Sequence, residues 1–165
     1  MPAHPNPHQD ELAELALKRV GASGAEYGDI RILDSTTQTI RGEDHRIASI
    51  QEARDSGFGI RVLYHGAWGF AASSILSLEE APRVAELAIE IAKGSASLAS
   101  EKVKLADEPV HRDRVVTARR IDPFAVALEN KTALLLETME YVHRQSGIMR
   151  SSASLWARQD RKLFV

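Results

Sequence analysis

The sequence contains no cysteine, and aromatic residues make up only 5% of it. Disulfides, a cysteine nucleophile and thiolate metal ligands are therefore excluded within this chain. No apolar run approaches the ~20 residues that a membrane-spanning helix needs, and the N-terminus lacks the apolar stretch of a secretory signal. We therefore expect a cytoplasmic protein without a membrane partner.

An excess of charge of one sign is also missing. The 21 lysines and arginines stand against 23 aspartates and glutamates, which leaves a formal net charge of −2. Proteins that bind nucleic acids usually carry a basic field that holds the phosphate backbone. We expect no nucleic-acid partner.

What is present is enough apolar material for a core, since 44% of the 165 residues are hydrophobic. That length suits one domain or one and a half. The first nine residues are an exception, because Pro2, Pro5 and Pro7 oppose a helix, and we predict a disordered tail over residues 1–9. His4 and His8 have the spacing of a helical metal pair, but without a helix we expect both to be solvated.

Residues 10–96 are predicted to form an α+β domain in which helices pack against an antiparallel β-meander. The first helix should run from its N-cap, Asp10, to Gly21. β-Prone residues then alternate with polar ones, and a helical period returns from Ala81 to Gly94. The expected strands are residues 30–40, 46–54, 57–64 and 67–74. The expected buried stripes are Leu12, Leu15, Ala16 and Val20 on the first helix, and Val84, Leu87, Ala88 and Ile91 on the second.

The last two of these strands should form a hairpin with one apolar side for a helix to cover. Alternation places two sets of side chains on that side: Phe58, Ile60, Val62 and Tyr64, and then Trp68, Phe70 and Ala72. Trp68 and Trp156 are interpreted as core anchors, because each lies in a β-pattern beside small residues.

Residues 97–120 are rich in Ser, Ala and mixed charges and are predicted to be a linker. Residues 121–165 then begin a second α+β segment, whose helix should start at Asp122 and Pro123 and end at Gly147. Two strands, 148–157 and 162–165, should follow, joined by a turn at 158–161. Because the chain stops at two apolar residues in mid-strand, we expect this segment to be truncated and its last backbone groups to be unpaired.

No catalytic, cofactor-binding or metal-binding residue is predicted. None of the six histidines is followed by Glu, and a nucleophile elbow, a Walker loop and a dinucleotide fingerprint are all absent. The serines at positions 73 and 74 lack an identifiable base, so we interpret them as turn residues. The basic residues between 111 and 120 are diluted by acids and are interpreted as a solvated face. The glycines at 57, 59 and 69 are interpreted as allowing close approach of backbone or aromatic groups.

The hairpin carries a resemblance to a known family. Residues 57–71, Gly-Phe-Gly-Ile-Arg-Val-Leu-Tyr-His-Gly-Ala-Trp-Gly-Phe-Ala, resemble the N-terminal signature of the TldD/PmbA family. Residues 24–32 resemble the first strand of that family. Ile121-Asp-Pro-Phe with Asn130-Lys131 resembles the helix start of its second segment. The run from Ala67 to Ala71 looks more like the TldD side of the family.

The resemblance implies a cytoplasmic zinc metallopeptidase that is much longer than this chain and was formerly described as a modulator of DNA gyrase. Such enzymes digest small or unstructured peptides and mature peptide precursors. The zinc site of the family, a His-Glu-x-x-x-His helix with a later Cys, is absent here, so no cofactor is assigned to this chain. The implied partner is a TldD/PmbA-family subunit, in a homo- or hetero-oligomer. The alternative is a stand-alone, non-catalytic scaffold module that pairs with a full-length family member.

Overall fold

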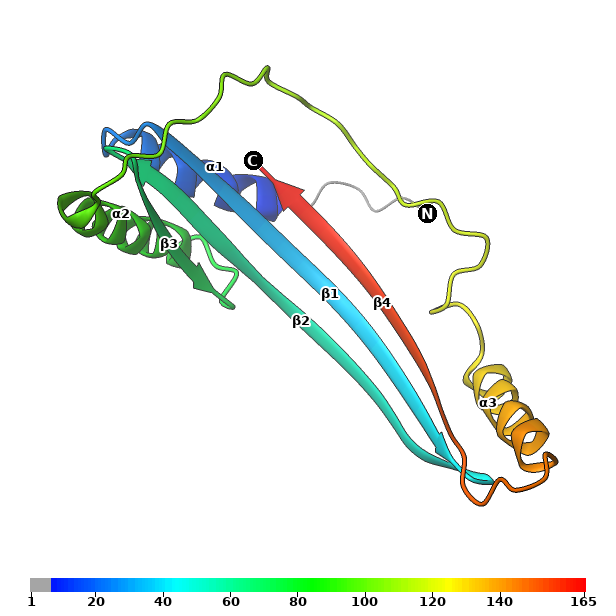
Figure 1. Ribbon diagram of the computed structural model, residues 1–165. Coiled ribbons are helices and arrows are strands. Elements are labelled where there is room, and N and C mark those ends of the chain that lie inside the picture. Colours follow the sequence, from blue (N-terminus) through cyan, green and yellow to red (C-terminus); the bar gives the residue numbers. More distant parts are fainter. Residues whose placement is uncertain (1–6) are drawn as a thin grey trace. The chain divides into compact units, whose positions relative to one another are not determined.

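The computed structural model describes residues 7–165 and has an α+β fold. Four antiparallel strands form one sheet in the order β3-β2-β1-β4 (Figure 1). No helix in residues 7–165 has both the length and the apolarity to cross a membrane. The elements are α1 (Pro7–Gly21), β1 (Tyr27–Glu43), β2 (Arg46–Tyr64), β3 (Ala67–Ser73), α2 (Glu80–Leu98), α3 (Leu128–His143) and β4 (Ser152–Phe164).

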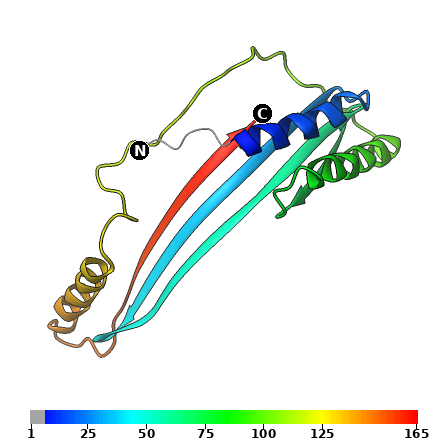
Figure 2. The same cartoon turned by 180° about the vertical axis from the view of Figure 1, so that it is seen from behind.

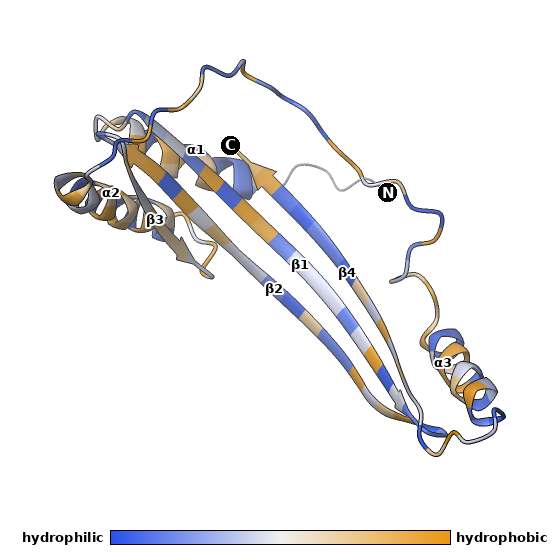
Figure 3. Cartoon of the chain, viewed as in Figure 1, coloured by the Kyte–Doolittle hydropathy of each residue, from blue (hydrophilic) through white to orange (hydrophobic). Residues whose placement is uncertain are grey.

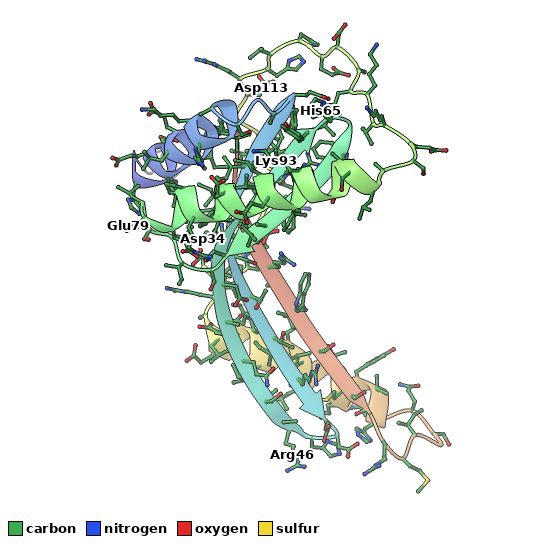
Figure 4. The ribbon with its side chains drawn as sticks, turned by 90° about the vertical axis from the view of Figure 1, so that its left-hand side faces the viewer. Asp34, Arg46, His65, Glu79, Lys93 and Asp113 are labelled. Atoms are coloured by element: carbon green, nitrogen blue, oxygen red, sulfur yellow. The ribbon has the colours of Figure 1, made fainter. Side chains whose placement is uncertain are left out.

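The chain divides into two compact units that do not follow its order. Within the described residues, unit 1 comprises 7–34, 55–109 and 160–165, and unit 2 comprises 35–54 and 110–159. The three long strands β1, β2 and β4 each contribute residues to both units. Figure 4 labels Asp34, the residue at which β1 leaves unit 1, and Arg46, the first residue of β2 in unit 2. This division differs from the consecutive segments 10–96 and 121–165, because β4 pairs with the first strand of the chain.

Unit 1 has a continuous apolar core between its helices and its strands. The predicted stripe of α1 is largely confirmed: Leu12, Ala16 and Val20 are buried. α2 packs against β3 and against α1, and Figures 1 and 2 both show α2 beside β3. In Figure 3 hydrophobic residues appear on α2 and along the neighbouring part of β2. The core side chains from the strands are Ile30, Ile32, Phe58, Ile60, Val62 and Ala71.

The tightest packing in unit 1 lies between β3 and α2. A Cβ atom on Gly69 would come within 2.1 Å of the Ala88 carbonyl oxygen and 2.5 Å of the Ala92 backbone nitrogen. The predicted role of this glycine, close backbone approach, is therefore confirmed. The predicted covering face of α2 is confirmed for Val84 and Ala88, which are buried, and was wrong for Leu87 and Ile91, which are exposed. The buried face is built mostly of small residues: Ala81, Val84, Ala85, Ala88, Ile89 and Ala92.

Unit 2 has fewer buried residues than unit 1, and one of them is a lysine. Lys131 on α3 is only 5% exposed, and its Nζ donates a hydrogen bond of 2.6 Å to Oε1 of Gln38 on β1. The Nε2 of Gln38 in turn donates to Oε1 of Glu52 on β2. Buried ammonium groups need such partners, because desolvation penalises an unpaired charge. The buried apolar residues of unit 2 are Ile40, Leu135, Met139 and Ala157.

Two predicted strand boundaries were wrong. Residues 46–54 and 57–64 are one strand, β2, and residues 158–161 continue β4 rather than turning the chain. Both breaks were predicted at polar stretches, but a polar residue is tolerated in a strand whose ladder is hydrogen-bonded. Val165 is also paired, since it exchanges hydrogen bonds of 3.0 and 2.9 Å with Ile30. The predicted hairpin face was wrong on β3, where Ala67, Gly69 and Ala71 are buried and Phe70 is exposed.

The helix ends also differ from the predictions. α1 begins at Pro7, because proline is tolerated in the first turn of a helix, and it therefore includes His8 and Gln9 of the predicted tail. Residues 1–6, with His4, lie outside the described part. α2 continues past Gly94 to Leu98. Asp122 forms a turn, in which its Oδ1 accepts a hydrogen bond from the Phe124 amide, and α3 begins six residues later at Leu128.

Candidate functional site

A groove of about 490 Å³ lies on unit 1, on the sheet face that α1 and α2 leave open. Side chains alternate across a strand, so odd positions of β1 and β2 and even positions of β3 share this face. The volume lies within the range of ligand-binding clefts. The lining residues used below are Asp29, Arg31, Asp55, Gly59, Arg61 and Phe70.

An acid buried at one end of the groove holds an arginine. Asp29 is 1% exposed, and its Oδ2 accepts a hydrogen bond of 2.8 Å from Nε of Arg61 and lies 2.5 Å from Nη2 in an ion pair. The hydrogen bond to Asp29 raises the pKa of the Arg61 guanidinium above its usual value. The other carboxylate oxygen, Oδ1, has no hydrogen-bond partner. Nε of Arg31 lies 3.5 Å from Oδ1.

Aromatic rings on the outer strands orient both arginines. The guanidinium carbon of Arg61 lies 5.1 Å from the ring centroid of Trp68, and that of Arg31 lies 5.0 Å from the ring centroid of Phe164. Tyr27 meets Trp68 edge to face, with the centroids 5.9 Å apart. Such contacts favour a fixed guanidinium plane. Burial and the neighbouring Asp29 raise the pKa of the Tyr27 phenol, so it stays neutral.

Phe70 on β3 forms an apolar wall of the groove. A Cβ atom on Gly59 would come within 2.8 Å of the Phe70 ring, which confirms the predicted aromatic approach at this glycine. Phe70 stands opposite Arg61 in the β2–β3 register and is 58% exposed. An exposed aromatic ring beside an oriented arginine suits a ligand with both apolar and anionic parts.

The groove can bind a ligand, but its residues do not form a catalytic constellation. Ser73 accepts a hydrogen bond of 3.1 Å from the Ile75 amide, and its hydroxyl also helps to lower the pKa of Glu80. No histidine lines the groove. None of its residues was predicted as a site from the sequence. One sequence signal could have revealed the groove: Asp29 and Arg31 are charged residues at alternating positions of an otherwise apolar strand segment.

The other residues weighed in the sequence lie apart from the groove or at its edge. Trp68 is half-buried and supports Arg61, while Trp156 is 63% exposed, so the prediction of a core anchor was wrong for Trp156. Residues 110–120 are exposed and have no regular secondary structure. In Figure 4, Lys93 on α2 and His65 in the β2–β3 turn lie at the edge of unit 1; the Nζ of Lys93 is 5.5 Å from the Tyr64 ring centroid.

The histidines do not combine into a metal site. His45 and His143 in unit 2 stack with ring centroids 4.4 Å apart and an interplanar angle of 28°. Ring nitrogens bind metals through lone pairs in the ring plane, so stacked rings do not direct them to one point. Asp44 lies 3.4 Å from Nε2 of His143, but its carboxylate accepts the Ser151 amide, which lowers the pKa of Asp44. Residues 7–165 contain no group of three or more potential ligands.

Comparisons with known proteins show which family this region resembles. Residues 28–92, which include β2, β3 and most of α2, match the family model described as PmbA/TldA metallopeptidase domain 1. The chain contains a TldD/PmbA-like N-terminal region. A metalloprotease of Methanocaldococcus jannaschii is 32% identical to it over 113 residues, which are 68% of this chain and 25% of that protein. A metalloprotease of Methanothermobacter thermautotrophicus is 40% identical over 73 residues, 44% of this chain and 15% of that protein.

Solved structures share the fold of the TldD/PmbA-like region. A protein from Bacteroides thetaiotaomicron, named as a modulator of DNA gyrase, superposes with a TM-score of 0.77 at 13% identity, over 97% of this chain and 37% of its own. TldE from Thermococcus kodakarensis superposes with a TM-score of 0.62 at 14% identity, over 95% of this chain and 34% of its own. The chain therefore spans about a quarter of the metalloprotease from M. jannaschii and about a third of these structures.

Proposed function

We propose that the chain is the N-terminal part of a cytoplasmic TldD/PmbA-type zinc metallopeptidase that hydrolyses small or unstructured peptides and matures peptide precursors. The match of residues 28–92 to a first metallopeptidase domain carries this proposal. The metalloprotease name of the M. jannaschii relative supports it. In this proposal the TldD/PmbA-like region frames the substrate cavity and the subunit interface.

The zinc of such an enzyme would be held outside residues 7–165. The described residues do not fit a zinc site, because the only adjacent histidine pair in unit 2 is stacked and no group of three ligands surrounds it. The contribution of this region is therefore binding and positioning, through the buried ion pair and the apolar wall of the groove. Its proposed partner is a second TldD/PmbA-family subunit, of the TldD or the TldE kind.

The coding sequence downstream of codon 165 provides the first test. We expect an open frame that continues into a His-Glu-x-x-x-His segment with a later Cys. The protein expressed from that frame, with its family partner, should cleave an unstructured peptide such as the β-casein chain, and a chelator should abolish the cleavage. The matched control is the same protein with Gln in place of the motif Glu.

Two results would contradict the proposal. One is a long product that retains zinc but leaves unstructured peptides intact. The other is a stop codon after Val165 with a stable complex between this chain and a full-length family member. The second result would support the alternative, a non-catalytic scaffold module.

A further inference from the structure

The end of the groove at Asp29 carries an excess of positive charge. Two guanidinium groups, Arg31 and Arg61, flank a single buried carboxylate, Asp29, so the three side chains sum to +1. The remaining acid, Asp55, lies six positions along β2 from Arg61, which is about 20 Å in an extended strand. The groove is therefore positive at one end and negative at the other.

Arg31 is the less tightly held and more exposed arginine of this group. Arg61 donates a hydrogen bond to Asp29 and forms a close ion pair with it, whereas Arg31 lies 3.5 Å from the second carboxylate oxygen and its side chain is 59% exposed. That oxygen is buried and lacks a hydrogen bond, which is an unfavourable state for a carboxylate. A shift of Arg31 by a few tenths of an ångström would complete the hydrogen bond and align both guanidinium groups on one acid.

We propose that this groove binds the C-terminal carboxylate of a short peptide, so that it acts as an end-recognition subsite. The carboxylate would accept hydrogen bonds from the outer N–H groups of both arginines and neutralise the excess charge. Both arginines line the groove together with the apolar ring of Phe70, which packs over Gly59. Phe70 supplies an apolar surface for the last side chain of the peptide. The proposal rests on the peptidase function above and names the part of the substrate that this region recognises.

The probe is acetyl-Ala-Ala-Ala-Leu with a free carboxylate, titrated into the 165-residue protein by calorimetry. Its C-terminal amide is the matched ligand, because it differs only by the terminal charge. We expect the amide to bind at least tenfold more weakly, since charge-assisted hydrogen bonds are lost. A third peptide, acetyl-Ala-Asp-Ala-Leu amide, carries its carboxylate on a side chain. Equal binding of the third peptide and the acid would show that any carboxylate suffices and would overturn recognition of the chain end.

Arg31→Gln is the decisive variant, because Asp29 keeps its hydrogen bond and ion pair with Arg61 and the fold is preserved. It should weaken binding of the acid about tenfold and leave the weak binding of the amide unchanged. Arg31→Lys should recover part of the affinity. Arg41→Gln removes an exposed arginine from the same strand in unit 2 and should have no effect. Unchanged binding by Arg31→Gln, or equal binding of acid and amide, would refute the proposal. Because no cleavage is measured, that failure is distinct from a failure of the peptidase function.

Discussion

The two units of this molecule stabilise themselves by different means. Unit 1 buries a continuous cluster of apolar side chains between two helices and the sheet, and its closest contact is backbone against backbone at Gly69. Unit 2 buries fewer apolar residues and places a lysine, Lys131, among them, held by Gln38. The mostly small residues on the buried face of α2 permit close approach of the β3 backbone but no rearrangement, whereas the long side chains of Met139 and Lys131 in unit 2 can adapt. The two units should therefore respond differently to the same substitution.

The largest difference in stability is expected between two glycine-to-alanine substitutions, one in each unit. Gly69→Ala should destabilise the protein by about 3 kcal/mol, because the new Cβ meets backbone atoms that cannot move aside. Gly42→Ala should cost about 1 kcal/mol or less, because its Cβ would clash with the Cε and Sδ atoms of Met139, the flexible end of a side chain, and would meet the Arg46 carbonyl oxygen at an ordinary 3.5 Å. Urea unfolding of both variants measures the difference. Equal losses would show that unit 1 is not packed more rigidly than unit 2.

The next effect concerns the buried lysine. Lys131→Met should cost about 2 kcal/mol, because Oε1 of the buried Gln38 loses its donor. The double variant Lys131→Met with Gln38→Met should recover much of that loss, since both polar groups are then removed together. Lys18→Met on the exposed face of α1 in unit 1 is the control and should change stability by less than about 0.5 kcal/mol. Additive losses in the double variant would show that the hydrogen bond does not couple the two residues.

A smaller effect, a gain in stability, is expected for a substitution on the exposed side of α2. A Cβ atom on Gly94 would meet no atom within 4 Å, so Gly94→Ala should stabilise the helix by about 1 kcal/mol or slightly less. Gly147→Ala in unit 2 is the contrasting substitution, because Gly147 has φ +85° and alanine is strained there. The thermal midpoint should rise for the first variant and fall for the second. A lower thermal midpoint for Gly94→Ala would contradict the observation that α2 continues past residue 94.

The smallest effect is a pH dependence of unit 1. Hydrogen bonds from Arg83 and then Ser73 lower the pKa of Glu80 to about 2, below its ordinary value of 4.5. A lowered folded-state pKa stabilises the protein above the ordinary value, and this contribution disappears as the pH falls from about 4.5 to about 2. The denaturant midpoint should therefore fall between pH 5 and pH 3, and the fall should be smaller for Glu80→Gln than for the wild type. Glu90→Gln on the same helix, which removes the same charge, should keep the wild-type slope.

Local sequence signals predicted the local features of the fold. The predicted hairpin of residues 57–64 and 67–74 is present, with its turn at His65-Gly66, and the glycines at 59 and 69 have the predicted close contacts. Each of these depends on one or two residues and their backbone conformations. The family resemblance rests on the same hairpin.

The face of α2 and the lengths of the strands could not be obtained in this way. Leu87 and Ile91 fit a helical stripe as well as Ala85 and Ile89 do, so the period alone does not choose between the two faces. The choice depends on Gly69, because only a face of small residues allows the strand backbone to approach so closely. Polar residues in β2 and β4 predicted breaks, but strand pairing satisfies the backbone there and the strands continue.

The sequence by itself determined the α+β class, the first helix, the hairpin turn and the absence of cysteine chemistry, because these follow from composition and short-range periodicity. Only the tertiary structure decided the groove. Its acid, its two arginines and its aromatic wall come from β1, β2 and β3, and they share one surface because the strand register brings alternate positions together. Alternation within one segment shows which of its side chains share a face but not which strands lie beside it, so the sequence of one segment could not specify the groove.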